Sequence, residues 1–124
     1  MSTLSIQIEP LEQDTRRVLL GGRLDTHTWS HLESALEPVL AERPGMLLLD
    51  LQALEYISSA GLRSFFRARK QLAAHGGKVL VLHPQPQIRK VFELVKAFPL
   101  NEIFVSREEL DVYLEAMQEK VREG

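Results

Sequence analysis

Cysteine is absent from the 124 residues of this chain. Its absence excludes a disulfide framework, a thiolate zinc site and a cysteine nucleophile, and it argues against a small secreted scaffold. Long hydrophobic runs are lacking too, because no stretch approaches the roughly 20 apolar residues that cross a bilayer. The N-terminus has no basic stretch followed by an apolar one. We therefore expect a cytoplasmic protein that is neither exported nor inserted into a membrane.

An excess of positive charge is also missing. Fifteen Lys and Arg against seventeen Asp and Glu give a net charge of −2, so nothing marks nucleic acid as the default partner. The length lies below the roughly 150 residues of a typical domain, and 44% of the residues are hydrophobic. The chain is thus expected to fold as one domain, residues 1–124, with an ordinary core.

Four apolar patterns predict strands. Alternation along residues 3–9 indicates a strand with one buried face, and residues 16–22 indicate a second strand that pairs with it as a hairpin. The near-continuous apolar runs at 46–51 and 79–82 are typical of buried strands, and we expect the first of these to be a central parallel strand. A short strand is expected at 103–105.

Helices are predicted at 27–42, 59–74, 87–96 and 106–121, where apolar residues recur at three- and four-residue spacing. Pro38 should kink or shorten the first helix. Ser106 and Glu109 suggest a capping box for the last helix, and the final residues, 118–124, are expected to fray. Strands separated by helices predict an α/β sandwich with a mostly parallel sheet, an N-terminal hairpin and about four helices.

Two adjacent serines stand between the central strand and the second helix, in the segment YISSAGL at 56–62. In an α/β sheet, sites gather in the loops that follow the strands. One hydroxyl, that of Ser58 or Ser59, can cap the helix while the other is presented outward at the positive end of the helix dipole, where a phosphate would be stabilised. From these residues alone, two serines that simply cap the helix are the favoured explanation of the pair.

Three motifs at their observed separations resemble the STAS domain of bacterial anti-sigma factor antagonists: GRLD at 22–25, LDL at 49–51 and ISSAGL at 57–62. The resemblance spans nearly the whole chain and implies a STAS-type sandwich. In that family a small-residue loop opens the second helix and carries a regulatory phosphoserine, and alignment on Gly61 and Leu62 places the phosphoacceptor on Ser59. The chain departs from the usual motif at Ser58, where many members have Asp, and at Ala60, where they have Ser or Thr.

The resemblance implies a switch protein without catalytic activity, cofactor or metal. In its unphosphorylated form it would bind an anti-sigma factor that is a serine kinase of the histidine-kinase-like ATPase type. That partner would phosphorylate Ser59 and release the protein, and a PP2C-type phosphatase would reset it. Ser59 is then a substrate of another enzyme.

Further residues are expected to build the partner surface around the two serines. Asp25 and Thr26 can cap the first helix, and the resemblance adds their loop to the partner surface. Arg63 lies one helical turn after Ser59, where it could pair with a phosphate or an acidic partner, or be a solvated surface residue. Asp50 is expected to support the 58–61 loop by accepting its backbone donors. The predicted partner-binding set is Asp25, Thr26, Ser58, Ser59, Ala60, Gly61 and Arg63.

Two alternatives remain open on the sequence. The first is a STAS adaptor subunit that is never phosphorylated and serves another complex, such as the cytoplasmic component of a lipid transporter. The second is a small serine hydrolase, although Ser59 lies in no G-x-S-x-G elbow. His27 and His31 are four residues apart but have no third ligand of matching spacing, so a metal site is not expected.

Overall fold

One mixed β-sheet organises the chain, of which the computed structural model describes residues 3–97 and 106–124. Within that part the strand order is β1-β2-β3-β4. Strand β1 (Leu4–Ile8) pairs antiparallel with β2 (Thr15–Leu24), and β3 (Met46–Ile57) lies parallel to both β2 and β4 (Lys78–Leu82). The predicted hairpin and the central parallel strand are confirmed.

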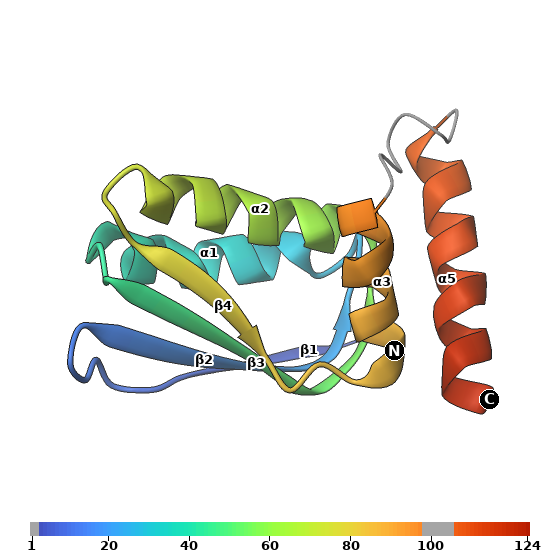
Figure 1. Cartoon of the computed structure of the whole chain (residues 1–124), viewed down its shortest axis with the longest axis horizontal. Coiled ribbons are helices and arrows are strands. Elements are labelled where there is room, and N and C mark those ends of the chain that lie inside the picture. The colour runs from blue at the N-terminus through green and yellow to red at the C-terminus, as the bar shows by residue number, and fades with distance from the viewer. Residues whose placement is uncertain (1–2, 98–105) are drawn as a thin grey trace.

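Helices cover one face and one end of this sheet (Figure 1). Helices α1 (Trp29–Ala41) and α2 (Ser59–Ala73) lie side by side over the face, while α3 (Pro86–Ala97) and α5 (Arg107–Glu123) run across the end where β2 and β3 finish. The α/β class with a mostly parallel sheet is therefore confirmed. Because α5 crosses the carboxyl ends of the strands, it can reach the loop that opens α2.

The core lies between the sheet and its helices and consists mainly of leucine. Leu32 and Leu36 of α1 belong to the same core cluster as Leu47 and Leu49 of β3, and all four are buried. The two α1 leucines lie at the predicted helical spacing, and the two β3 leucines lie within the apolar run that predicted a buried strand. Burying a leucine side chain contributes about 1.5–3 kcal/mol, so this layer fixes α1 and α2 on the sheet and with them the loops that precede the two helices.

Two strands are longer than expected. Strand β2 continues through the Gly21–Gly22 pair to Leu24, and β3 continues to Ile57 instead of ending at residue 51. The parallel register shifts around Gly21 and Gly22, where Gly22 has a φ of 85°, a conformation that favours glycine. The glycines therefore shift the β2–β3 register without ending the pairing. The two strands continue to pair beyond the apolar segments from which they were predicted.

Pro38 lies inside α1 without shortening it, since the helix continues to Ala41. Proline removes the backbone hydrogen bond to the carbonyl of Ser34, but Ser34 is exposed, so water can satisfy that carbonyl.

Strand β4 is less buried than expected: Val79 and Val81 pack against the core, whereas Leu80 alternates to the other side and is 44% exposed. The strand expected at 103–105 lies outside the described residues.

The last helix is more securely anchored than expected. Its N-cap is Ser106, whose hydroxyl accepts a hydrogen bond from the Glu109 N–H at 3.1 Å, which confirms this half of the predicted capping box. The predicted fraying from residue 118 is wrong, because α5 continues to Glu123 and Gln118 is 1% exposed. Tertiary hydrogen bonds to the end of β3 hold this turn in place.

Candidate functional site

Ser58 uses its hydroxyl to begin α2. Strand β3 ends at Ile57, and the Ser58 Oγ then accepts a hydrogen bond from the Gly61 N–H at 3.3 Å. The Ser58 N–H donates to the carbonyl of Leu24 at 2.9 Å, and the residue is 2% exposed. Ser58 is thus a buried N-cap that ties the helix start to the end of β2.

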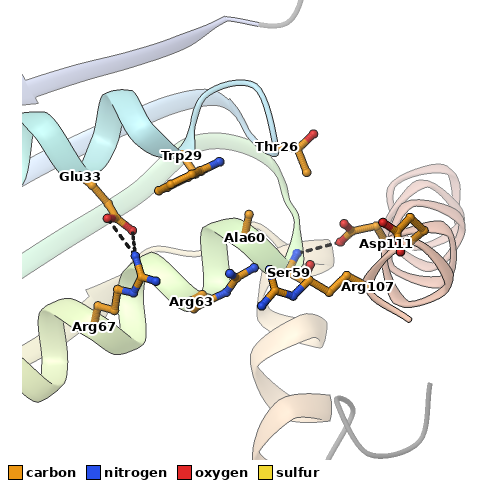
Figure 2. Close-up of a pocket in the computed structure, with 10 residues that line it drawn as sticks. Thr26, Trp29, Glu33, Ser59, Ala60, Arg63, Arg67, Arg107 and Asp111 are labelled. Atoms are coloured by element: carbon orange, nitrogen blue, oxygen red, sulfur yellow. Dashed lines mark hydrogen bonds and ion pairs between the residues drawn. The ribbon is translucent and has the colours of Figure 1, made fainter. Parts of the chain in front are cut away.

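Ser59 is the first residue of α2 and is half-buried beside a pocket of about 270 Å³. Its N–H donates to Asp111 Oδ1 of α5 at 2.9 Å (Figure 2). Within the described residues its hydroxyl makes no hydrogen bond. The two serines therefore divide the work as the sequence suggested, one capping and the other facing the pocket, and whether Ser59 is a phosphoacceptor remains a prediction.

Charged side chains from three helices surround this pocket, which α1, α2 and α5 build together. Arg67 of α2 pairs with Glu33 of α1 at 3.0 Å, and the Ser64 hydroxyl donates to the same carboxylate at 2.8 Å. The residues that line the pocket are Thr26, Trp29, Glu33, Ser59, Ala60, Arg63, Arg67, Arg107, Glu108 and Asp111.

Arg63 is the basic residue of this pocket that lies one turn after Ser59 (Figure 2). Burial lowers its pKa, and the positive charges of Arg107 and Arg67 lower it further. An arginine remains protonated at any physiological pH. The pocket therefore places a charged guanidinium near the Ser59 hydroxyl, with the carboxylates of Glu33 and Asp111 close enough to act on it.

The loop before α1 borders the same pocket, but its two expected site residues differ in exposure. The Asp25 carboxylate accepts from the His27 N–H at 2.9 Å, and the Thr28 hydroxyl accepts from the Asp25 N–H at 2.9 Å. Asp25 is 8% exposed, while Thr26 is exposed and lines the pocket. Asp25 thus shapes the loop from within, and Thr26 presents its side chain outward. Thr28 is the N-cap position of α1 but makes no side-chain cap bond.

Ala60 and Gly61 are buried in the first turn of α2. A Cβ added at Gly61 would lie 2.7 Å from the Leu24 side chain and 3.0 Å from that of Ile57. Glycine at this position is explained by the close approach of α2 to the ends of β2 and β3. Of the two, Ala60 lines the Ser59 pocket.

Asp50 does not support the 58–61 loop, and that expectation is corrected. Because β3 extends to Ile57, Asp50 lies inside the strand, where its carboxylate accepts from Arg17 and from the Gln52 N–H at 3.0 Å. Asp50 is 2% exposed and Arg17 comes from the neighbouring strand β2. The carboxylate therefore joins β2 to β3 some distance from the serine pair.

This pair predicts a pH dependence of stability. Burial raises the pKa of Asp50, but the hydrogen bonds from Arg17 and Gln52, together with the positive charges of Arg17 and His83, outweigh it, so the pKa lies below its ordinary value near 4. A carboxyl whose pKa is lowered by folding stabilises the fold fully above the ordinary value. It loses this contribution as pH falls from that value through the lowered pKa of the folded state. Urea unfolding at pH 7 and pH 3 should therefore show a smaller loss of unfolding free energy for Asp50→Asn than for wild type.

An exposed carboxylate provides the control for that measurement. Glu37 on α1 makes no hydrogen bond or ion pair among the described residues. Glu37→Gln should lose as much stability as wild type between the two pH values. If Asp50→Asn behaves like Glu37→Gln, the proposed role of the Arg17–Asp50 pair is contradicted.

Two residues of α5 hold the site and were missed by sequence reasoning. Asp111 accepts from the Ser59 N–H, and Gln118 bonds both backbone groups of Ile57, accepting from its N–H at 3.0 Å and donating to its carbonyl at 2.8 Å. These contacts span 52 and 61 residues of chain. No local pattern signals them, because each is an ordinary polar residue of an amphipathic helix.

The geometry gives no support to metal or hydrolase chemistry. His27 precedes α1 while His31 lies within it, and the described residues contain no cluster of three or more ligands that could hold a metal. No histidine lines the described part of the Ser59 pocket, so the hydroxyl has no imidazole to activate it.

Among the described residues, no helix is sufficiently long and apolar for a membrane span.

Comparison with protein-family models places residues 11–110 in a known domain: they match the model of the STAS domain. The chain belongs to the STAS domain family. This STAS domain is similar over 89 residues, at 33% identity, to a protein of Bordetella bronchiseptica named "Putative anti-sigma factor antagonist BtrV", covering 72% of this chain and 77% of that protein.

Solved structures of STAS proteins share the fold. An anti-sigma factor antagonist from Mycobacterium paratuberculosis aligns with a TM-score of 0.66 and 26% identity over 94% of this STAS domain and 95% of that chain. The Bacillus cell fate determinant SpoIIAA in its phosphorylated form aligns with a TM-score of 0.62 and 23% identity, over 77% of this chain and 86% of the other. The predicted STAS-type architecture is thereby confirmed.

Proposed function

We propose that this STAS protein is an anti-sigma factor antagonist that changes partner when Ser59 is phosphorylated. Support for the general role comes from its relatives, since both the Bordetella and the Mycobacterium proteins carry the name anti-sigma factor antagonist. Support for the switch comes from one observation: Ser59 is a half-buried serine on the pocket at a helix N-terminus, with a hydroxyl that the described structure leaves unbonded.

Phosphorylation would change this surface strongly. The Ser59 Oγ would attack the γ-phosphorus of ATP, an Oγ–P bond would form, and the bond to the ADP leaving group would break while a base on the kinase takes the hydroxyl proton. The product carries about −1.5 to −2 additional charges. The N-terminus of α2 stabilises that charge within the folded protein, whereas an interface closed over it would incur desolvation and repulsion.

The partner in this proposal is an anti-sigma factor that is itself a serine kinase of the histidine-kinase-like ATPase type. It binds the unphosphorylated protein and releases the phosphorylated one, and a PP2C-type phosphatase restores the first state. Thr26, Ser59 and Arg63 supply side chains to this interface at the pocket. Ser58, Asp25 and Gly61 are buried and act by holding the two loops in place.

Phosphate transfer to purified protein tests the proposal. The protein is incubated with its anti-sigma factor and ATP, and intact mass with peptide mapping then locates the modification. We expect one added phosphate in wild type and none in Ser59→Ala. Ser58→Ala is the matched control and should still accept phosphate, because the Ser58 hydroxyl is buried under its own helix. Equal labelling of Ser59→Ala and wild type would contradict the assignment of Ser59, and a wild-type protein that accepts no phosphate would favour an adaptor role.

A further inference from the structure

Two arginines from different helices line the Ser59 pocket. Arg63 belongs to α2 and Arg107 begins α5, and their guanidinium groups lie next to Ser59 in Figure 2. Among the described residues neither makes a hydrogen bond or an ion pair. Burial and then the positive charge of Arg107 lower the pKa of Arg63, while the carboxylates of Glu33 and Asp111 raise it. An anion placed between the two arginines would relieve their repulsion.

The third arginine of the pocket is already neutralised. Arg67 donates to both carboxylate oxygens of Glu33, at 3.1 and 3.0 Å. Arg63 and Arg107 are therefore the two guanidinium groups of the pocket that the described structure leaves for a new anion. They reach the same space from α2 and from α5, whose first residues are otherwise joined by the bond between the Ser59 N–H and Asp111.

A phosphate ester on the Ser59 oxygen matches this arrangement in position and chemistry. Guanidinium groups bind phosphate oxygens in a bidentate manner, and the phosphate would also lie at the positive end of α2. Two carboxylates oppose it, since Glu108 and Asp111 line the same pocket. The two arginines offset these two acids in charge, and the helix N-terminus adds its partial positive charge on the side of the phosphate.

We infer that Arg63 and Arg107 form a receiving site for a phosphate group on Ser59, so that modification ties the first turn of α5 to the first turn of α2. The inference rests on the proposed function for the identity of the phosphoacceptor, and it adds a second element to the switch. Phosphorylation then alters the surface of α5 as well as that of α2. A partner bound to either helix would respond to the same phosphate.

Phosphoserine installed at position 59 during translation tests this site without any kinase. The second pKa of phosphoserine, ordinarily near 6, is followed by ³¹P NMR in the folded protein and in a short peptide of the same sequence. The folded protein should titrate about one unit lower than the peptide, and Arg63→Gln and Arg107→Gln should each recover a substantial part of that shift. Arg69→Gln is the control, because Arg69 is an exposed arginine of α2 that lines a different groove.

Hydrogen exchange supplies a second readout that does not depend on titration. Phosphoserine at 59 should slow amide exchange in the first turn of α5, residues 107–111, and Arg107→Gln should abolish that protection. A phosphate that titrates as in the peptide, or one that Arg107→Gln leaves unchanged in both readouts, would overturn the inference. Failure of the anti-sigma factor to phosphorylate Ser59 would overturn the proposed function and leave this measurement valid.

Discussion

A negative charge at position 59, introduced as Ser59→Asp, is expected to weaken binding to the anti-sigma factor at least about tenfold, which corresponds to about 1.4 kcal/mol. The Ser59 side chain lies on the pocket, so a partner that closes over it must desolvate the new carboxylate. The loss should be smaller than that caused by phosphate, because aspartate adds one charge and phosphate adds up to two. Isothermal titration calorimetry of the two proteins measures this difference.

Ser59→Ala and Ser58→Ala are the matched controls for this experiment. Ser59→Ala removes the hydroxyl without adding charge and should keep the affinity of wild type. Ser58→Ala should cost about 1 kcal/mol of folding stability through the lost N-cap, with little effect on affinity, because Ser58 is buried. Equal affinities of Ser59→Asp and wild type would count against the switch.

Gln118→Leu is expected to lower the free energy of unfolding by about 3 kcal/mol. The variant keeps the approximate size of the side chain but leaves the N–H and carbonyl of Ile57 without their partners, and an unsatisfied buried polar group costs about 1–3 kcal/mol. Because small domains are stable by only about 5–15 kcal/mol, this loss should be plain in urea unfolding. It should also loosen the Ser58–Ser59 segment, which follows Ile57 directly.

A second glutamine serves as the control, because it separates the loss of the bonds to Ile57 from any general cost of replacing glutamine with leucine. Gln71 is exposed on α2, and Gln71→Leu should change the unfolding free energy by no more than about 0.5 kcal/mol. A loss below 1 kcal/mol for Gln118→Leu would show that water or another group replaces the bonds to Ile57, and the anchoring role of α5 would then be wrong.

The architecture was predictable where burial imposes a period on the sequence. Leu32 and Leu36 recur at helical spacing because one side of α1 faces the sheet, and the apolar run at 46–51 marked β3 because that strand is buried in the sheet. Capping chemistry likewise predicted that one serine of the pair would cap α2, and the structure shows that this serine is Ser58. Each of these features depends on residues only a few positions apart, and such local patterns can be recognised from the sequence alone.

The remaining features depend on contacts between distant segments. Asp50 stands near a predicted strand end, but pairing with β2 extends β3 past it, so its partners became Arg17 and Gln52. Asp111 and Gln118 reach the site only because α5 crosses the end of the sheet. No periodicity reports which polar residue of an amphipathic helix faces a strand end 50 to 60 residues earlier.

The switch itself is tested most directly by following the complex while phosphate is transferred. The purified complex of this protein with its anti-sigma factor is given ATP, and native mass spectrometry records the complex and the modified protein over time. The account predicts that the complex of wild type dissociates in step with the appearance of phosphate on Ser59, while the complex of Ser59→Ala persists. A complex that stays intact with Ser59 fully phosphorylated would contradict it.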